Sequence, residues 1–462
     1  MVRHTIFVLL ICVLIRLVVM VIAAPWTPET EKRLIGRGDP SIYHALGVSL
    51  SEGRGYYHHK YGKVVHEETL GWAYPGEPEV LWPPGYSAFL ALNYRLFGVQ
   101  LTSVVLMQIL LSSIGCFFFK SAVEQLYGAR AGMWAGLLYA LDPVLIFLSN
   151  SIWSEALFIP LMTVPVYCLA AILASNTLTN RFSPYVLHAL LGLTLGASTW
   201  VRVSTFPLLY ALTIALGIWE WKRVRRLSHV ALTVSALCLS FYAAIAPWCL
   251  RNFLLTGVWS FSTSASYNLL VGLAATDEEI DALLNKAYKE AVRDGRDPRS
   301  LNPFDRAVYW RKVALHQIRT NYFKYLSISL KRWFVTFTTP GTSGWGVLLG
   351  VDIPQRDARS ERLVDILREF IQRFTLPIGF IPVYSVAYLT FIYFIFIAKI
   401  IHIIRDFNDR YIFVILFLVI VSIVAQVNNY SPRGRTQAFL FIVPLAAAHL
   451  SNSTISLRTN KK

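Results

Sequence analysis

The sequence predicts an all-α protein that crosses a membrane several times, and three observations lead to this fold class. First, the 462-residue chain is 55% hydrophobic and only 15% charged, with a mean hydropathy of +0.49, which is more apolar than a soluble domain. Second, apolar runs near the length of a bilayer-spanning helix recur along the chain. Third, basic residues gather in short segments between these runs.

The apolar runs predict roughly ten transmembrane helices of about 18 to 25 residues each. They lie near residues 5–24, 100–119, 131–149, 153–174, 184–200, 203–219, 229–250, 376–398, 411–427 and 436–450. The first run ends in Ala-Ala-Pro, like a signal-peptide cleavage site, but it is long for the apolar region of a signal peptide and carries Arg16. We therefore expect a retained first helix, with Arg16 as an anchor whose charge reaches the membrane surface.

Two long polar stretches interrupt the apolar runs and divide the chain into three predicted regions. Residues 1–250 form a transmembrane module that holds most of the candidate site and includes the first non-cytoplasmic loop at 25–85. Residues 251–375 form a second non-cytoplasmic loop region with amphipathic helices, of which 305–334 shows the amphipathic pattern. Residues 376–462 supply the C-terminal transmembrane helices. No internal repeat relates these regions.

Basic residues orient the chain, because Lys and Arg concentrate in cytoplasmic loops. With a cytoplasmic N-terminus, the basic connections that fall inside contain Lys120, Arg130, Arg181, Lys222, Arg223, Arg225, Arg226, Lys399, Arg405 and Arg410. Both polar stretches then lie on the non-cytoplasmic side, together with the turns at 142–155, 200–204 and 428–436. The net charge of +16 is therefore a signal of topology, and we expect contact with membrane lipids rather than with nucleic acid.

The five cysteines predict neither a disulfide framework nor a structural zinc site. All of them fall inside or at the ends of apolar runs, without CxxC or His-paired spacing. We assign no metal ligands from the sequence. A divalent ion shared by Asp39 and Glu155 stays open, because carboxylates are suitable ligands but no spacing requires it.

The first polar stretch offers a carboxylate just beyond the first predicted helix. Asp39 stands in the run Gly-Asp-Pro-Ser-Ile-Tyr-His, which includes Tyr43 and ends at His44. One interpretation is structural, because Asp before Pro makes a favourable helix start. The other is chemical, because a carboxylate at the membrane surface can accept a proton from a substrate hydroxyl within hydrogen-bond reach. The sequence leaves both interpretations open.

The next motif is Leu-Trp-Pro-Pro-Gly-Tyr, which ends at Tyr86. Its double proline predicts an extended segment that leads into a helix at the membrane interface. The aromatic residues of the motif are of the kind that favours that interface.

Further charged residues stand at the ends of predicted helices on the same side. Glu155 begins an apolar run, where an acid is explained either by the helix dipole or by a function in an outward-facing cavity. Arg202 lies between two runs, and Arg251 follows another. Guanidinium groups at these places can bind an anion through charge-assisted hydrogen bonds.

Taken in order, these motifs resemble the GT-C glycosyltransferases, in particular the branch related to protein O-mannosyltransferases and lipid A aminoarabinose transferase. The resemblance is carried by Asp39 with Tyr43, Pro83 to Tyr86, Arg95 to Gly98, Ser154 with Glu155, Arg202 with Pro207, Pro247 with Trp248, Arg251 and Asn252, and Tyr267 to Leu269 with Gly272. One departure concerns the acidic motif: protein O-mannosyltransferases have Asp-Glu, whereas Pro40 follows Asp39 here.

The resemblance implies a GT-C fold with juxtamembrane helices on the non-cytoplasmic face. It also implies an enzyme that moves a hexose or pentose from a polyprenyl phosphate, of dolichyl or undecaprenyl type, to a hydroxyl of a glycan, lipid or protein acceptor, with inversion. Asp39 is then expected to act as general base and Glu155 to orient the acceptor or Asp39. The expected phosphate ligands are Arg202, Arg251, Arg433 and Arg435, and the expected pocket residues are Tyr43, His44, Tyr86, Tyr267 and Asn268.

Two other functional classes remain open. A membrane transporter or lipid flippase also needs many spans, but it predicts polar residues at mid-membrane depth and paired halves with interrupted helices. A membrane scaffold whose loops bind a protein predicts no cluster of acids and arginines on one face. Neither the sugar, the acceptor nor the oligomeric state follows from the residues, and for a prokaryotic source we expect the inner membrane.

Overall fold

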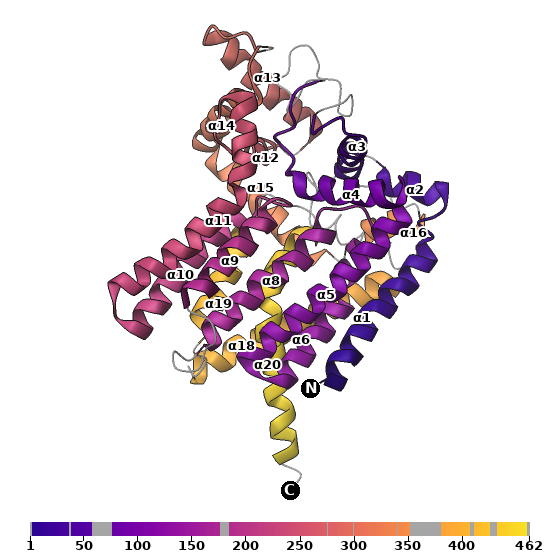
Figure 1. Ribbon diagram of the computed structural model, residues 1–462, viewed down its shortest axis with the longest axis vertical. Helices are drawn as coiled ribbons and strands as arrows, with labels where there is room; N and C mark the ends of the chain where they lie inside the picture. The colour runs from indigo at the N-terminus through magenta and orange to yellow at the C-terminus, as the bar shows by residue number, and fades with distance from the viewer. Residues whose placement is uncertain are drawn as a thin grey trace.

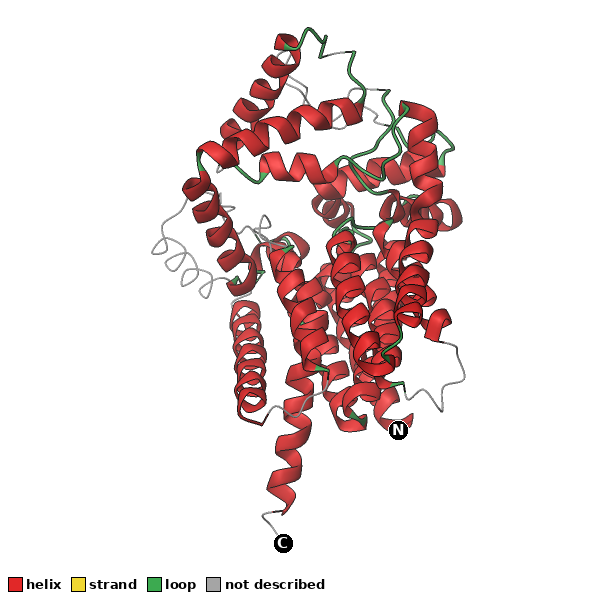
Figure 2. Cartoon of the chain, turned by 90° about the vertical axis from the view of Figure 1, so that its left-hand side faces the viewer, coloured by secondary structure: helices red, strands yellow, loops and turns green. Residues whose placement is uncertain are grey.

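The computed structural model describes residues 2–36, 38–57, 76–175, 184–274, 276–298, 300–339, 341–351, 380–406, 411–425 and 432–459. Helices are the regular structure throughout these residues, as Figure 2 shows in red, and one isolated bridge joins Tyr57 to Pro78. The predicted all-α class is therefore confirmed. Residues 58–75 and 352–379, and Arg181 of the predicted cytoplasmic connections, lie outside the described residues.

Long apolar helices form the transmembrane bundle. Among the described residues, five helices are long and apolar enough to cross a membrane by themselves: α1 (Val2–Ala23), α5 (Leu101–Tyr127), α8 (Glu155–Ala174), α11 (Leu227–Thr256) and α18 (Phe380–Asp406). The other predicted runs coincide with α6 (Ala129–Leu141), α7 (Pro143–Ser149), α9 (Pro184–Thr199), α10 (Thr205–Val224), α19 (Ile412–Val424) and α20 (Arg435–Thr459). The total of roughly ten spans stays a prediction.

The two ends of the bundle differ in what they carry. Both termini lie at one end, which we name the terminus end (Figure 1). The opposite end, the loop end, carries α2 (Pro28–Ile35), α3 (Asp39–Ser51), α4 (Pro84–Phe97), α12 (Ser264–Val271), α13 (Asp277–Arg293) and α14 (Pro303–Thr320). The expectation that both polar stretches share one face is therefore met by their described residues.

The second polar stretch has a small core of its own. Trp310 is fully buried there among leucine and alanine side chains of α12, α13 and α14. This stretch also contains α15 (Tyr322–Thr338) and α16 (Thr342–Leu349). The buried Arg306 guanidinium of α14 bonds both carboxylate oxygens of Glu77, one of them at 2.9 Å, and so joins the first polar stretch to the second.

A broken helix shapes the inner part of the loop end. Helices α6 and α7 meet at an angle of 57°, and the Asp142 carboxylate between them accepts hydrogen bonds from the first amides of α7, those of Val144 and Leu145, at 2.8 and 3.0 Å. On the other side of the break, Arg16 Nη1 donates to the Ala140 carbonyl at 3.0 Å. The interpretation of Arg16 as a surface anchor is wrong, because its side chain is fully buried. It donates hydrogen bonds at the end of α6, where backbone carbonyls have no partner within the helix.

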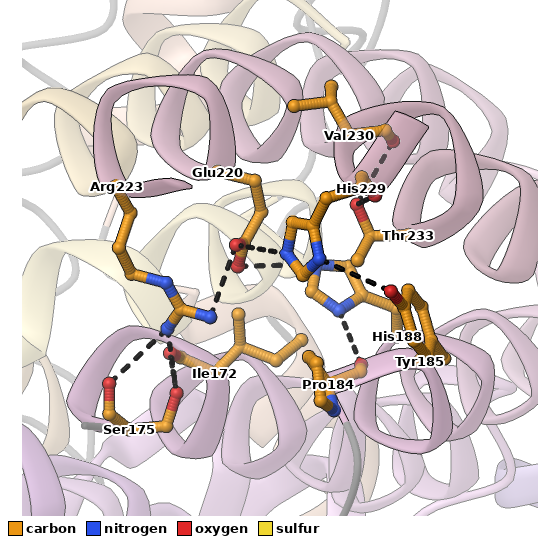
Figure 3. Close-up of polar contacts among 10 residues, drawn as sticks. All are labelled: Ile172, Ser175, Pro184, Tyr185, His188, Glu220, Arg223, His229, Val230 and Thr233. Atoms are coloured by element: carbon orange, nitrogen blue, oxygen red, sulfur yellow. Dashed lines mark hydrogen bonds and ion pairs between the residues drawn. The ribbon is translucent and has the colours of Figure 1, made fainter. Parts of the chain in front are cut away.

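The terminus end is fastened by a buried carboxylate (Figure 3). Glu220 of α10 lies 3.0 Å from His229 Nε2 of α11, 3.1 Å from Arg223 Nη2 and 3.9 Å from His188 Nε2 of α9. Arg223 also donates to the hydroxyl of Ser175, just after α8, at 3.0 Å. These four ionisable residues, which we name the Glu220 cluster, connect the ends of α8, α9, α10 and α11.

Candidate functional site

Asp39 lies at the first position of α3, with its side chain directed at an arginine. Gly38 is the residue that precedes the helix, so Asp39 does not occupy the capping position that the structural interpretation assumed. Its carboxylate lies 3.6 Å from Arg433 Nη1. Arg433 belongs to the short 3-10 helix η1 (Pro432–Gly434) just before α20. Residues almost 400 positions apart in the sequence therefore meet at the loop end.

Glu155 begins α8 and faces two guanidinium groups. Its Oε1 lies 2.9 Å from Arg202 Nη1 and 3.4 Å from Arg433 Nη1. Arg202 also donates to the Ser154 hydroxyl at 3.0 Å. We name Asp39, Glu155, Arg202 and Arg433 the acid–arginine cluster. The Glu155 side chain is 4% exposed, whereas the other three are 21 to 35% exposed, so the cluster is buried at Glu155 and open at Asp39.

Aromatic side chains hold the cluster from the side of the first polar stretch. The Tyr43 ring packs edge-on against Trp82 and Tyr86, with centroids 5.3 and 5.1 Å apart. The Tyr86 hydroxyl donates to Gln108 of α5 at 2.8 Å, and the Gln108 amide donates to the Ser151 carbonyl at 3.1 Å. This chain of contacts fixes the turn that leads to Glu155.

The Pro-Pro-Gly-Tyr motif positions Arg202 through close backbone contact. As predicted, Pro83 is extended and α4 begins at Pro84. The next residue, Gly85, donates its amide to the Trp200 carbonyl at 2.7 Å. A Cβ at Gly85 would lie 2.7 Å from that same carbonyl oxygen, so a glycine is required for this approach.

The electrostatics of the first polar stretch keep two side chains neutral. Burial, together with the Asp39 carboxylate, raises the pKa of the Tyr43 phenol far above its usual range, so Tyr43 stays protonated. Burial lowers the pKa of His44, whose Nδ1 shares a hydrogen bond of 2.9 Å with the Tyr94 hydroxyl. Burial lowers the pKa of the Arg202 guanidinium, but Glu155, Tyr43 and Asp39 together outweigh burial and raise this pKa.

Arg251 is not brought to the acid–arginine cluster. Its guanidinium donates to the carbonyls of Glu79 and Tyr56 at 2.9 and 2.8 Å and stacks 4.5 Å from the Trp248 ring. The following Asn252 donates to the carbonyl of Phe261 at 3.0 Å. The Pro-Trp-x-x-Arg-Asn stretch therefore fastens the first polar stretch to α11.

Three other predicted residues lie away from the cluster. Arg435 is buried and donates to the carbonyls of Thr336, in the last turn of α15, and of Thr339, just after that helix. Tyr267 packs edge-on against Trp310 in the second core, at 5.4 Å between centroids, and Asn268 is an exposed neighbour on α12. The predicted pocket is therefore divided between the two polar stretches.

Sequence reasoning passed over two side chains that shape the site. Trp153 lies with its ring 3.5 Å from the Arg433 guanidinium, and Gln108 joins Tyr86 to the turn before Glu155. Both have a signal in the sequence: Trp153 stands two residues before Glu155, and Gln108 is a polar residue inside an apolar run.

The described residues do not form an evident metal site. Nowhere in the described ranges do three or more His, Cys, Asp or Glu side chains converge as ligands of one ion. In the acid–arginine cluster, both carboxylates are paired with arginines.

Comparisons with known proteins agree with this fold. Residues 82–248 match a sequence family described as dolichyl-phosphate-mannose-protein mannosyltransferase. The structure is similar to an oligosaccharyltransferase, AglB of Archaeoglobus fulgidus, in complex with an inhibitory peptide and dolichol-phosphate, with TM-score 0.52, 13% identity and coverage of 99% of this chain. The apo form of the Archaeoglobus fulgidus oligosaccharyltransferase gives TM-score 0.53 at 14% identity and 99% coverage. The chain spans 51% of the length of each of these two chains.

A third similar structure is ArnT of Cupriavidus metallidurans bound to undecaprenyl phosphate, at 12% identity and TM-score 0.34, covering 96% of this chain and 78% of that one. No curated protein matches the sequence significantly. The resemblance to the GT-C superfamily is confirmed by the family match and by the shared fold. The chain is an integral membrane protein with the GT-C fold.

Proposed function

We propose that this protein is a glycosyltransferase that moves a single sugar from a polyprenyl-phosphate donor to an acceptor hydroxyl, with inversion at the anomeric carbon. The observation that carries the proposal is the acid–arginine cluster, in which a partly exposed carboxylate lies beside two guanidinium groups at the loop end. The reaction needs these groups, because a base must activate the hydroxyl and cations must accept the leaving phosphate.

Asp39 is the proposed base because its carboxylate is the more exposed of the two acids. It takes the proton of the acceptor hydroxyl while the acceptor oxygen forms a bond to the anomeric carbon. The bond from that carbon to the phosphate oxygen breaks, and the lipid phosphate leaves with the bonding electrons. A single direct displacement inverts the configuration.

Arg202 and Arg433 are the proposed phosphate ligands. Their guanidinium groups lie within 3.6 Å of the site carboxylates and remain partly exposed, so a phosphate can reach them. Arg251 and Arg435 bond backbone carbonyls instead, and we assign them to holding the loops in place. Glu155 fixes the position of Arg202 and lies 3.4 Å from Arg433, the arginine that pairs with Asp39.

The proposed donor and membrane side follow from different observations. The archaeal oligosaccharyltransferase with the same fold was captured with dolichol-phosphate, which supports a polyprenyl-phosphate donor. The loop end lies opposite to both termini (Figure 1), and the basic connections predict cytoplasmic termini. The site therefore faces the non-cytoplasmic side, which in a prokaryote is the outer face of the inner membrane.

The proposal is tested with purified protein and a panel of lipid-phosphate sugars, by following release of the lipid phosphate. We expect release or transfer with one donor class and none with Asp39→Asn, which keeps the side-chain size but removes the base. The melting temperature of the variant shows whether folding is intact. Near wild-type turnover in a folded Asp39→Asn protein would remove Asp39 from the mechanism, and inactivity with every donor would reject the reaction class.

A further inference from the structure

One guanidinium nitrogen of the site is shared between two acids. Arg433 Nη1 lies 3.6 Å from Asp39 Oδ2 and 3.4 Å from Glu155 Oε1. Both separations are longer than the 2.9 Å between Arg202 and Glu155. They lie within the range of an ion pair but beyond that of a charge-assisted hydrogen bond, so each is a loose pairing.

The two arginines of the site are held in different ways. Arg202 makes two short contacts, 2.9 Å to Glu155 and 3.0 Å to Ser154. The Arg433 guanidinium instead lies 3.5 Å from the Trp153 ring. Stacking supports a guanidinium by its face, and its N–H groups point outward from the edge of the plane. Arg433 is therefore held in place without depending on short bonds to either acid.

Asp39 depends on Arg433 for its pairing. Within the described parts of the chain, Arg433 is the partner of its only ion pair. Their side chains are 35% and 21% exposed, so the pair is accessible from outside. The donor phosphate is a diester with one negative charge, and two of its oxygens can accept a bidentate pair of bonds from the guanidinium edge. Asp39, by contrast, makes one contact with this edge, at 3.6 Å.

We propose that Asp39 and the donor phosphate compete for Arg433, and that phosphate binding releases Asp39 as the free carboxylate. The inference rests on the proposed function. It makes Arg433 a positioning residue as well as a phosphate ligand: without donor it holds Asp39 back, and with donor it turns to the phosphate. Activation of the base is then tied to the presence of the donor.

The test measures the affinity of farnesyl phosphate, a short isoprenyl monophosphate without a sugar, for the full-length protein in detergent. If Asp39 competes for Arg433, Asp39→Asn tightens binding about fivefold, the effect of removing one partly exposed ion-pair partner, although the same change abolishes transfer. Arg433→Gln weakens binding about tenfold, as loss of a charge-assisted contact does. In the Arg433→Gln background, Asp39→Asn then changes the affinity less than twofold.

The double variant separates competition from general charge repulsion. If Asp39→Asn tightens binding equally with and without Arg433, simple repulsion between carboxylate and phosphate accounts for it, and the inference is overturned. Unchanged or weaker binding in Asp39→Asn overturns it as well. Absence of farnesyl phosphate binding in the wild type contradicts the proposed function itself, so the two failures are distinguishable.

Matched controls keep the result interpretable if a variant folds poorly. Arg433→Lys keeps the charge and loses the planar fork, so we expect an affinity between those of the wild type and Arg433→Gln. Arg293→Gln removes an exposed arginine of α13 that pairs only locally with Glu290, and it should leave the affinity unchanged. Equal loss in Arg293→Gln and Arg433→Gln would show a nonspecific charge effect and overturn the assignment.

Discussion

The Glu220 cluster and the acid–arginine cluster lie at opposite ends of the bundle, and they differ in what surrounds the acid. At the terminus end, the fully buried Glu220 faces Arg223, His188 and His229, whose side chains are 1 to 20% exposed. At the loop end, two acids share two arginines, and Asp39 is 35% exposed. One group is closed and the other is open on one side.

The difference shows that burial of an acid in a membrane bundle does not by itself identify a catalytic site. Both glutamates satisfy the general expectation that an intramembrane acid is functional. Their outer contacts separate the two glutamates. Arg223, beside Glu220, donates to Ser175 and so links the ends of α10 and α8. His188 bonds the Pro184 carbonyl within α9. The acid–arginine cluster instead leaves charge accessible at Asp39. We therefore assign structure to the first group and chemistry to the second.

The largest expected effect in this comparison comes from replacing one arginine of each cluster, Arg202 or Arg223, by glutamine. Arg202→Gln should lower the rate of sugar transfer about 100- to 1,000-fold, the cost of removing one preorganised donor to a developing oxyanion. Arg223→Gln removes an arginine that also lies within 3.1 Å of a buried glutamate, but at the terminus end, and should retain most of the transfer rate. Steady-state kinetics on folded protein measure both. Similar losses in the two variants would break the assignment.

A second experiment replaces one glutamate of each cluster, Glu220 or Glu155, by glutamine and measures both stability and transfer. Glu220→Gln should lower the free energy of unfolding by about 3 kcal/mol, because it leaves Arg223 without its buried partner. Glu155→Gln should lower transfer far more than stability, since Arg202 and Arg433 remain partly exposed to water. Denaturation midpoints and transfer rates for both variants give the comparison. A stable Glu220→Gln protein that has lost transfer would reverse the assignments.

The smallest expected effect tests the backbone contact that positions Arg202. Gly85→Ala places a Cβ 2.7 Å from the Trp200 carbonyl oxygen, so the turn that carries Arg202 must shift. We expect transfer to fall about tenfold, because small displacements of a positioned group reduce rates steeply. Gly217→Ala is the control, since its Cβ would meet its nearest neighbour at an ordinary 3.7 Å. A fully active Gly85→Ala protein would show that this contact is dispensable.

Much of the fold could be predicted because each apolar run is a local property of the chain. The runs near 5–24, 153–174 and 229–250 coincide with α1, α8 and α11, since backbone groups in lipid must bond within one helix. Arg16 was misjudged because its role depends on a partner 124 positions away, the Ala140 carbonyl. No local pattern contains that contact.

The candidate site was predicted in part. Asp39, Glu155, Arg202 and Arg433 do meet, and Tyr43 packs beside them. Arg251 and Arg435 carry the same charge and stand at similar helix ends, but their guanidinium groups bond backbone carbonyls, those of Glu79 and Thr339 among them. The sequence shows that an arginine is present at a helix end, but it does not show in which direction its long side chain extends.

The sequence by itself determined the membrane class, the positions of most helices and the face on which the polar stretches gather, because hydropathy and charge act over local segments. The tertiary structure decided which acids and arginines are neighbours. Asp39 and Arg433 come together only when α3 and η1 pack at the same end. Such a pairing depends on the positions of whole helices, which no single segment specifies.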